Sequence, residues 1–167
     1  MHKKGKHLEQ DQKADPWEVR MRIEVYVLCS KSPGILKNAK AKWAVAAFED
    51  GPVDESALIW KRDGVVVSPN ATNKKASLVA LRDALKRFTK PAVINLYVQD
   101  PFVKNMLQTN MPYRWSTHEW RLFRYNREIK YCSLWQEIFG LLRNHAVRYV
   151  RSEELAGKQY IKDMEVE

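Results

Sequence analysis

The hydrophobic period of the chain changes near residue 70, from that of strands to that of a helix, and this change limits the folds that are open to it. Before that point apolar and polar residues alternate, as around Val25 and Val27, which is the period of a β-strand with one buried face. A second strand is predicted over residues 42–49, and a third stretch of strand over 56–68, divided by a turn at Asp63-Gly64. Consecutive strands joined by short turns predict an antiparallel meander.

Beyond the change, apolar residues recur every three or four positions, at Leu78, Leu81, Leu85 and Phe88, which is the pattern of an amphipathic helix. Pro91 ends this helix, and the β-branched run that follows predicts a buried strand. A helix between a meander and a further strand implies a crossover, and therefore a mixed sheet. The later elements are predicted as strand over 92–98, helix over 102–107, helix over 134–142, strand over 146–151 and helix over about 153–164.

Length and composition predict one compact domain. The chain has 167 residues, of which 45% are hydrophobic and 11% aromatic, and this much apolar surface excludes a disordered or low-complexity protein. Residues 1–18 are polar and without period, so we expect a flexible arm there and a folded domain over 19–167. No apolar run reaches the roughly 18 residues of a membrane span, which predicts a cytoplasmic protein. Cys29 and Cys132 fit neither a disulfide framework nor a zinc site and are expected to be reduced.

Positive charge is unevenly distributed along the chain. Lys and Arg number 29 against 20 Asp and Glu, which gives a formal charge of +9. Between Lys104 and Arg151 there are nine Lys and Arg residues and three Glu residues, so this stretch alone carries +6. An excess of this kind serves solubility in most proteins and binding of a polyanion in some. Its concentration in one stretch favours the second interpretation.

Four local motifs follow one another along the chain. They are a first strand leading into Cys29-Ser30 and Pro33-Gly34, a second strand that opens on Trp43, the segment Thr72-Asn73-Lys74 before the amphipathic helix, and the run from Glu128 to Trp135. In this order they resemble the type 1 ribonuclease H (RNase H) family, over roughly residues 22–165. The resemblance implies an α/β, RNase H-like fold, with a mixed five-stranded sheet (a three-strand antiparallel meander plus parallel strands) flanked by helices.

The family resemblance also implies a two-metal phosphodiester cleavage, in which four carboxylates hold two Mg²⁺ ions. Most of these carboxylates have no counterpart here. The first aspartate position falls on Leu28, and the glutamate position falls within Lys75-Ala76-Ser77. The position after the central strand falls on Gln99, or on Asp100 if the register slips by one residue. Asp163 alone has the family's spacing from the last strand, although a solvated helix residue is the alternative there. We therefore expect no metal site and no cofactor, with Asp163 and Asp100 as the remaining catalytic candidates.

A segment rich in arginine and aromatic residues, 113–131, is the predicted contact with nucleic acid. Cations neutralise phosphates and aromatic rings stack on bases or sugars, and the resemblance places a basic protrusion here and a strand-contacting segment at residues 72–74. The expected contacts are Arg114, Arg121, Arg124, Arg127 and Lys130 on phosphates, Trp115, Trp120 and Tyr125 on sugars or bases, and Thr72, Asn73 and Lys74 on the backbone of one strand. Two alternatives stay open, since the tryptophans can instead pack a helix against the sheet, and Thr72 or Asn73 can cap a helix.

The leading hypothesis is a catalytically degenerate RNase H-like domain that binds nucleic acid, an RNA/DNA hybrid or double-stranded RNA, without cleaving it. A protein-interaction module on the same scaffold is the alternative from another class, because a fold does not fix a function and exposed Trp and Arg also serve protein interfaces. Such domains are reused in mobile-element and phage assemblies. A third hypothesis is an active ribonuclease H with a relocated, Mg²⁺-dependent site.

Overall fold

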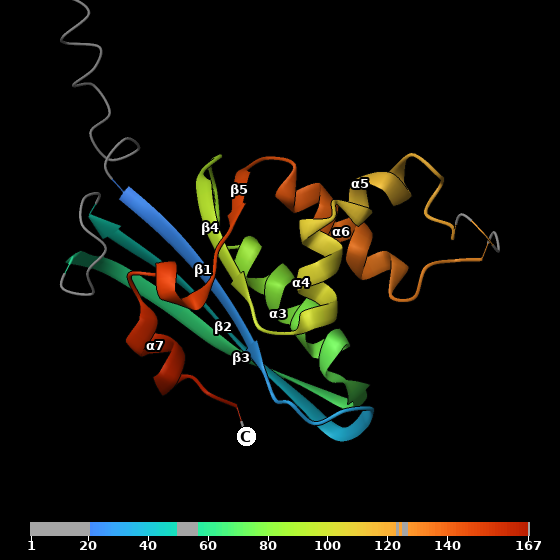
Figure 1. Cartoon of the computed structure of the whole chain (residues 1–167), viewed down its shortest axis with the longest axis horizontal. Helices are drawn as coiled ribbons and strands as arrows, with labels where there is room; N and C mark the ends of the chain where they lie inside the picture. Colours follow the sequence, from blue (N-terminus) through green and yellow to red (C-terminus); the bar gives the residue numbers. More distant parts are fainter. Residues whose placement is uncertain (1–20, 50–56, 123, 125–126, 167) are drawn as a thin grey trace, which may run out of the picture.

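The computed structural model describes residues 21–49, 57–122, 124 and 127–166, so the arm predicted over 1–18 lies outside the described residues. Five strands form one sheet in the order β3-β2-β1-β4-β5 (Figure 1). β1 pairs antiparallel with β2 and β2 with β3, whereas β4 pairs parallel with both β1 and β5. The predicted meander and mixed five-stranded sheet are confirmed. The strands are β1 (Met21–Cys29), β2 (Ile35–Glu49), β3 (Leu58–Thr72), β4 (Val93–Val98) and β5 (Ala146–Tyr149).

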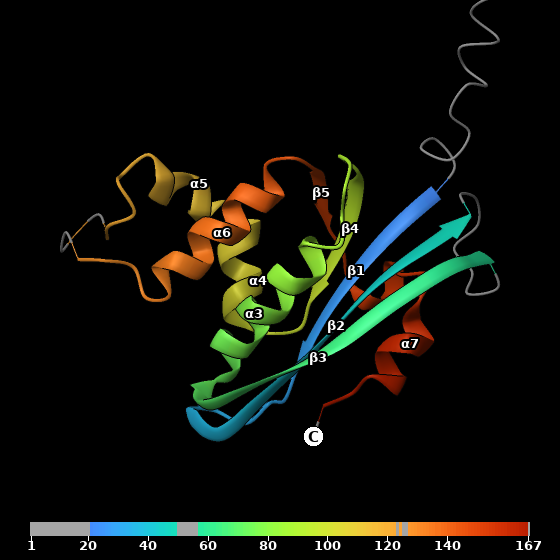
Figure 2. The ribbon, with the colours of Figure 1, turned by 180° about the vertical axis from the view of Figure 1, so that it is seen from behind.

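Helices cover the two faces of the sheet unequally (Figures 1 and 2). The larger layer contains α3 (Asn73–Leu85), α4 (Pro101–Gln108), α5 (Met111–Ser116) and α6 (Cys132–Leu142). Its core joins alternate residues of β1, such as Val25 and Val27, to Leu81 of α3 and Trp135 of α6. The crossover helix and the helix over 134–142 are therefore present as predicted, while the six-residue α5 was not predicted from the sequence. No helix of the described residues has the length and hydrophobicity needed to cross a membrane.

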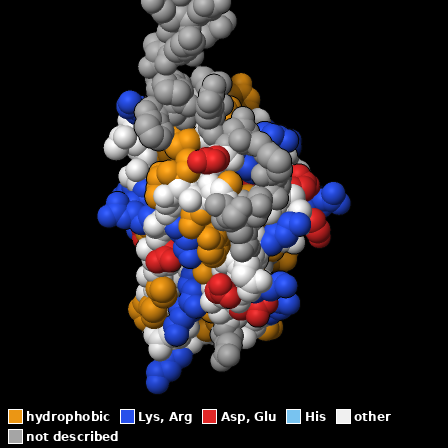
Figure 3. All heavy atoms as spheres, turned by 90° about the vertical axis from the view of Figure 1, so that its left-hand side faces the viewer, with side chains coloured by type: hydrophobic (Ala, Val, Ile, Leu, Met, Phe, Trp, Pro, Cys, Tyr) orange, Lys and Arg blue, Asp and Glu red, His pale blue; other side chains and the backbone are white. Residues whose placement is uncertain are grey.

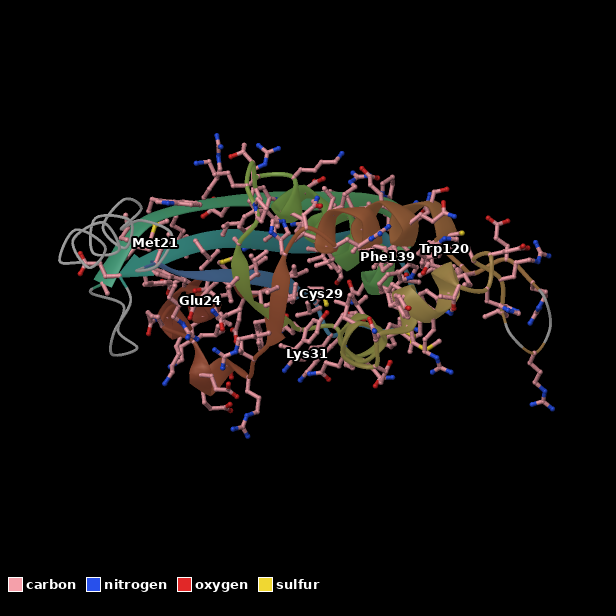
Figure 4. All side chains as sticks on the ribbon, turned by 90° about the horizontal axis from the view of Figure 1, so that it is seen from above. Met21, Glu24, Cys29, Lys31, Trp120 and Phe139 are labelled. Atoms are coloured by element: carbon pink, nitrogen blue, oxygen red, sulfur yellow. The ribbon has the colours of Figure 1, made fainter. Side chains whose placement is uncertain are left out.

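The opposite face is covered by the C-terminal segment, which contains η2 (Ser152–Glu154) and α7 (Lys158–Asp163). A smaller core there joins Tyr26 and Leu28 of β1 to Leu155 and Ala156. Glu24 lies fully buried in this layer, close to the C-terminal segment in Figure 4. A charged group tolerates such a position only when it is paired and hydrogen-bonded.

The carboxylate of Glu24 accepts four hydrogen bonds, two on each oxygen. Oε2 accepts from Arg22 Nε at 2.7 Å and from the Ala156 N–H at 2.8 Å. Oε1 accepts from the Tyr26 hydroxyl at 2.5 Å and from the Gly157 N–H at 3.0 Å. Burial, and then the hydrogen bond to Glu24, raise the pKa of Tyr26, so its hydroxyl stays protonated and donates. The carboxylate thus attaches the C-terminal segment to the centre of the sheet.

The turn predicted at Asp63-Gly64 is wrong. β3 runs without interruption from Leu58 to Thr72, and Gly64 pairs with Trp43 of β2. A Cβ at Gly64 would lie 2.6 Å from the indole Nε1 of Trp43. Glycine occupies this position because the indole of the neighbouring strand lies against the backbone, which is a common reason for glycine inside a strand.

The single helix predicted over 153–164 is also wrong. The chain forms the short 3₁₀ turn η2, then an extended residue at Leu155, and only then α7. Leu155 is fully buried, and the two amides that follow it donate to Glu24. At Gly157 a Cβ would overlap the Tyr26 hydroxyl. Packing against β1 therefore overrides helix propensity at this point.

Candidate nucleic-acid interface

The described residues between α5 and α6, 117–122, 124 and 127–131, are called the basic arm here, and they extend away from the sheet (Figures 1 and 2). Arg121 and Glu128 form an antiparallel bridge, and the Leu122 N–H donates to the Arg127 carbonyl at 2.6 Å. These contacts join the two sides of the arm. The cations predicted to contact phosphates are all exposed, namely Arg114 on α5 and Arg121, Arg124, Arg127 and Lys130 on the arm.

The aromatic residues of this segment pack inward more than was predicted. The indole of Trp115 is 4% exposed and lies edge-on to Trp135 at 5.4 Å between ring centroids, so the expected contact of Trp115 with a sugar or base is corrected to a packing role. Trp120 is half-buried and lies 5.8 Å from Phe139 of α6 (Figure 4). These contacts fix the arm to the helical layer. The predicted contact at Tyr125 lies outside the described residues.

The start of α3 contributes the second half of the predicted interface. Thr72 caps the helix, because its hydroxyl accepts from the Lys75 N–H at 3.2 Å. The same hydroxyl lies 3.0 Å from the hydroxyl of Tyr131 at the end of the arm. Lys74 is exposed, with its ammonium 4.4 Å from the ring centroid of Phe102. A hydrogen bond between side chains thus joins the arm to the start of α3.

Asn73 does not present its side chain to solvent, contrary to its predicted contact with a nucleic-acid strand. It is 7% exposed, and its amide Nδ2 donates to the carbonyls of Ser30 and Ser32, both at 2.8 Å. Asn73 therefore holds the turn between β1 and β2 against the start of α3. Its role is to position the neighbouring Thr72 and Lys74.

Two hollows share Thr72 and Lys74 in their linings, and the two together are called the groove below. The first, of about 410 Å³, is lined by the turn after β1 from Cys29 to Gly34, by residues 72–74, and by Gln99 to Pro101. The second, of about 520 Å³, is lined by Thr72, Lys74 and Phe102 on one side and by the arm on the other, including Arg127, Lys130 and Tyr131. The structure therefore brings together Thr72, Lys74, Arg127 and Lys130, which the sequence separates by more than fifty positions.

Two contributors to this groove were not predicted from the sequence. Phe102 lies at the start of α4, where it is 39% exposed beneath Lys74. Its position follows from Asp100-Pro101, a typical helix start that exposes the next residue. Lys31 lines the hollow beside Cys29 (Figure 4), and no pattern in the sequence distinguishes it from other surface lysines.

The positions where the family would hold metal ions carry no ligand set. Leu28 is fully buried among apolar side chains, and Ala76 and Ser77 in α3 are fully buried as well. Val27 pairs with Val98 in the parallel register, and the Gln99 N–H donates to the Val27 carbonyl at 2.9 Å. Gln99 thus holds the in-register position without a slip, and its side-chain oxygen already accepts from the Cys29 N–H at 2.9 Å.

The remaining carboxylate candidates, Asp100 and Asp163, each accept a hydrogen bond from a neighbour on the same helix. Asp100 is 7% exposed and caps α4, because its carboxylate accepts from the Val103 N–H at 2.9 Å. Asp163 is exposed at the last residue of α7 and accepts from the Gln159 amide at 3.2 Å. Within the described part of the chain, no three His, Cys, Asp or Glu side chains are placed to hold a metal ion. The family's two-metal arrangement therefore does not fit these residues.

The thiol of Cys29 belongs to this region and is poorly suited to react. Burial raises the pKa of Cys29, a hydrogen bond with Ser77 opposes this increase, and the nearby Asp100 carboxylate adds to it. A thiol must ionise before it acts as nucleophile or metal ligand. The Cys29 thiol therefore stays neutral in a hollow that is also lined by Lys31, Lys74 and Asp100.

No family model matches the chain, but curated relatives do. The protein named Ribonuclease H of Thermoanaerobacter sp. (strain X514) is 24% identical over 140 residues, covering 83% of this chain and 81% of the relative. The protein of the same name from Caldicellulosiruptor saccharolyticus is 28% identical over 80 residues, covering 48% of this chain and 54% of the relative.

Solved structures show the same architecture at low sequence identity. A type 1 RNase H described as having the type 2 active-site motif matches 86% of this chain and 70% of its own, with a TM-score of 0.60 and 20% identity. A foamy viral protease-reverse transcriptase in complex with an RNA/DNA hybrid matches 87% of this chain and 19% of its own, with a TM-score of 0.58 and 13% identity. The chain therefore has an RNase H-like fold, and its sequence is similar to that of proteins named Ribonuclease H.

Proposed function

We propose that this protein binds a nucleic-acid duplex along the groove between the turn after β1 and the basic arm, without cleaving it. The observation that carries the proposal is the convergence of Thr72 and Lys74 with Arg127 and Lys130 on one hollow. A duplex presents two phosphate backbones, and cations on both walls of a groove can neutralise both. An RNA/DNA hybrid is the first duplex to test, because a foamy viral protease-reverse transcriptase with the same fold was solved with such a hybrid.

The geometry of the groove supports binding by position as well as by charge. The bond between Thr72 and Tyr131 fixes the distance from the start of α3 to the arm. Phe102 holds the ammonium of Lys74 over its ring, which leaves the cation above the groove. Asn73 fixes the turn that forms the far wall. Groups that are already ordered lose less entropy on binding, so such a groove binds more tightly than loose lysines would.

The absence of cleavage in this proposal rests on residue chemistry. Magnesium requires oxygen ligands at fixed geometry. Three of the four positions present instead the hydrocarbon side chain of Leu28, the buried side chains of Ala76 and Ser77, and the Gln99 amide, whose oxygen already accepts from the Cys29 N–H. The side chains facing the groove can hold phosphates. They offer no activated water and no stabilisation for a leaving oxygen.

The test is fluorescence anisotropy on labelled duplexes of about 16 base pairs, as RNA/DNA hybrid, double-stranded RNA and double-stranded DNA, between about 50 and 200 mM salt. The variant Lys74→Ala/Arg127→Ala/Lys130→Ala removes three cations from the groove. The control, Lys37→Ala/Lys40→Ala/Lys158→Ala, removes the same charge from β2 and α7. Each phosphate contact contributes about 0.9 to the slope of log affinity against log salt.

We expect the groove variant to lower that slope by between about 2 and 3, and the control to leave it within about 0.5. Equal losses in both variants would mean that only net charge matters, and would refute the groove. Cleavage of the hybrid in Mg²⁺ or Mn²⁺ that Asp163→Asn abolishes would instead support an active ribonuclease H with a relocated site. Binding of none of the three duplexes would leave the protein-interaction alternative as the function of this face.

A further inference from the structure

A third hollow, outside the groove, lies at the opposite end of α3, where β1 and β4 begin. Its floor is Met21 and Ile23 of β1 with Val45 of β2, one wall is Trp60 of the edge strand β3, and the other wall is the connection 87–93. The indole of Trp60 is 43% exposed and Val93 is 57% exposed. On the face shown in Figure 3, apolar side chains reach the surface among charged side chains of both signs.

The size of the hollow selects the kind of ligand. Its volume is about 250 Å³, which is below the range of roughly 300–1,000 Å³ typical of small-molecule and cofactor sites. One large apolar side chain of a partner protein fits such a volume. Contact sites of this type commonly use a tryptophan beside an arginine, as found here in Trp60 and Arg87.

The charge around the hollow indicates which residues should flank the apolar side chain of the partner. Arg87 and Lys90 are exposed on its rim, and neither makes an ion pair with another described residue. Two nearby cations do form ion pairs. Lys86, just after α3, and Arg82 in α3 pair with Glu137 at 2.9 and 3.6 Å. No Asp or Glu lines the hollow among the described residues. Uncompensated cations at the rim of an apolar pocket complement acidic groups.

We propose that this hollow docks an acidic segment of a partner protein, through one large apolar side chain flanked by Asp or Glu. The hollow has few polar groups able to read a base edge, so its chemistry favours a peptide over a nucleic acid. It is separated from the nucleic-acid groove by the length of α3, about 20 Å for thirteen residues. Both sites can be occupied together, and the protein would then connect a nucleic acid to a protein partner.

The probe is the blocked hexapeptide Asp-Glu-Leu-Phe-Asp-Glu, titrated into the isotope-labelled full chain while the indole N–H signal of Trp60 is followed by NMR. Matched peptides replace Leu-Phe by Ser-Ser, or replace the four acids by lysine. We expect a saturable shift of the Trp60 signal with the first peptide alone. The variant Arg87→Glu/Lys90→Glu should weaken binding about tenfold or more, whereas the control Lys37→Glu/Lys40→Glu should leave it unchanged.

Four outcomes would overturn the proposal. One is the absence of a Trp60 shift at millimolar peptide, and another is equal binding of the Ser-Ser or lysine peptide. A third is tighter binding of the peptide after deletion of residues 1–16, because that segment of this chain would then be the occupant that the peptide displaces. A larger Trp60 shift with a single-stranded oligonucleotide would identify nucleic acid. Because duplex binding is measured separately through Lys74, Arg127 and Lys130, failure at this hollow leaves the proposed function standing.

Discussion

Glu24→Gln is the substitution that most directly tests how the C-terminal segment is held. The change keeps the size of the side chain but replaces one carboxylate oxygen by an NH₂ group. Both oxygens now accept two hydrogen bonds, so either orientation of the amide points a donor at donors. The less damaging orientation places the NH₂ beside Tyr26, because a hydroxyl can also accept.

The magnitude follows from the partners that remain unsatisfied. In that orientation the Gly157 N–H loses its acceptor inside a fully buried site, which costs about 1–3 kcal/mol. Arg22 also loses its carboxylate at 2.7 Å, and its side chain is 20% exposed, so water compensates only in part. Removing one partner of a buried ion pair costs about 3–5 kcal/mol in other proteins. Since Arg22 can be partly rehydrated, we expect the lower end, a loss of about 3 kcal/mol in the free energy of unfolding.

The assay is urea unfolding at neutral pH, followed by far-UV circular dichroism and tryptophan fluorescence. The matched control is Glu153→Gln, because that carboxylate is 72% exposed and lies 3.9 Å from Arg151; it should change stability by less than about 0.5 kcal/mol. Hydrogen exchange at the amides of Ala156 and Gly157 should accelerate in Glu24→Gln. A loss below about 1 kcal/mol, with these amides still protected, would refute the reasoning.

Three further predictions concern a histidine, the two cysteines and two glycines. Burial lowers the pKa of His145, whose Nδ1 accepts from the Ala92 N–H at 3.1 Å; stability should therefore be full above the unfolded value of about 6.5 and fall as the pH drops below it, and His145→Gln should reduce this dependence between about pH 7 and 5, as measured by urea midpoints. Burial raises the pKa of both Cys29 and Cys132, so a thiol reagent at neutral pH should modify the native protein at least about tenfold more slowly than the urea-unfolded chain, and rapid native labelling would contradict the described burial. Gly64→Ala should cost about 1–3 kcal/mol and shift tryptophan fluorescence, because the new Cβ would press on the Trp43 ring, whereas Gly140→Ala, with open space around it in α6, should be neutral or stabilising by up to about 1 kcal/mol.

Periodicity was sufficient for the order of the strands and of the main helices, because each buries one face and the pattern records which one. It could not identify features that depend on distant contacts. From its sequence neighbours alone, Gly64 is predicted to lie in a turn. In the structure glycine is required there because the indole of Trp43 on the next strand leaves no room for a Cβ. The break between η2 and α7 depends on Glu24, more than 130 positions earlier.

The candidate interface shows the same division between local and distant information. The exposed cations of the arm follow from local charge density, and all of those described lie at the surface. Burial of Trp115 depends on Trp135 of α6, and burial of Asn73 depends on the turn after β1. Residue type alone could not distinguish an aromatic ring that stacks on a base from one that packs on another helix.

Leu28 provides the last prediction, on whether this position of the apolar layer can accept a carboxylate. Leu28 is fully buried on the α7 side of the sheet, within an apolar layer that includes Tyr26, Ala44 and Leu155. In Leu28→Asp a carboxyl would enter this layer without the partners that Glu24 has, and the volume of the leucine would be lost. Each effect costs several kcal/mol, which is a large part of the roughly 5–15 kcal/mol that stabilises a typical domain. We therefore expect Leu28→Asp to lower the melting temperature by about 10 °C or more, which corresponds to a loss of roughly 4 kcal/mol or above, since each kcal/mol shifts the melting temperature by about 2–4 °C. Gln99 is half-buried, so Gln99→Asp should be tolerated. The double variant Leu28→Asp/Gln99→Asp tests the opposite outcome. If Mg²⁺ raised its melting temperature, the two carboxylates would be holding the ion, and the assignment of position 28 to the apolar core would be wrong.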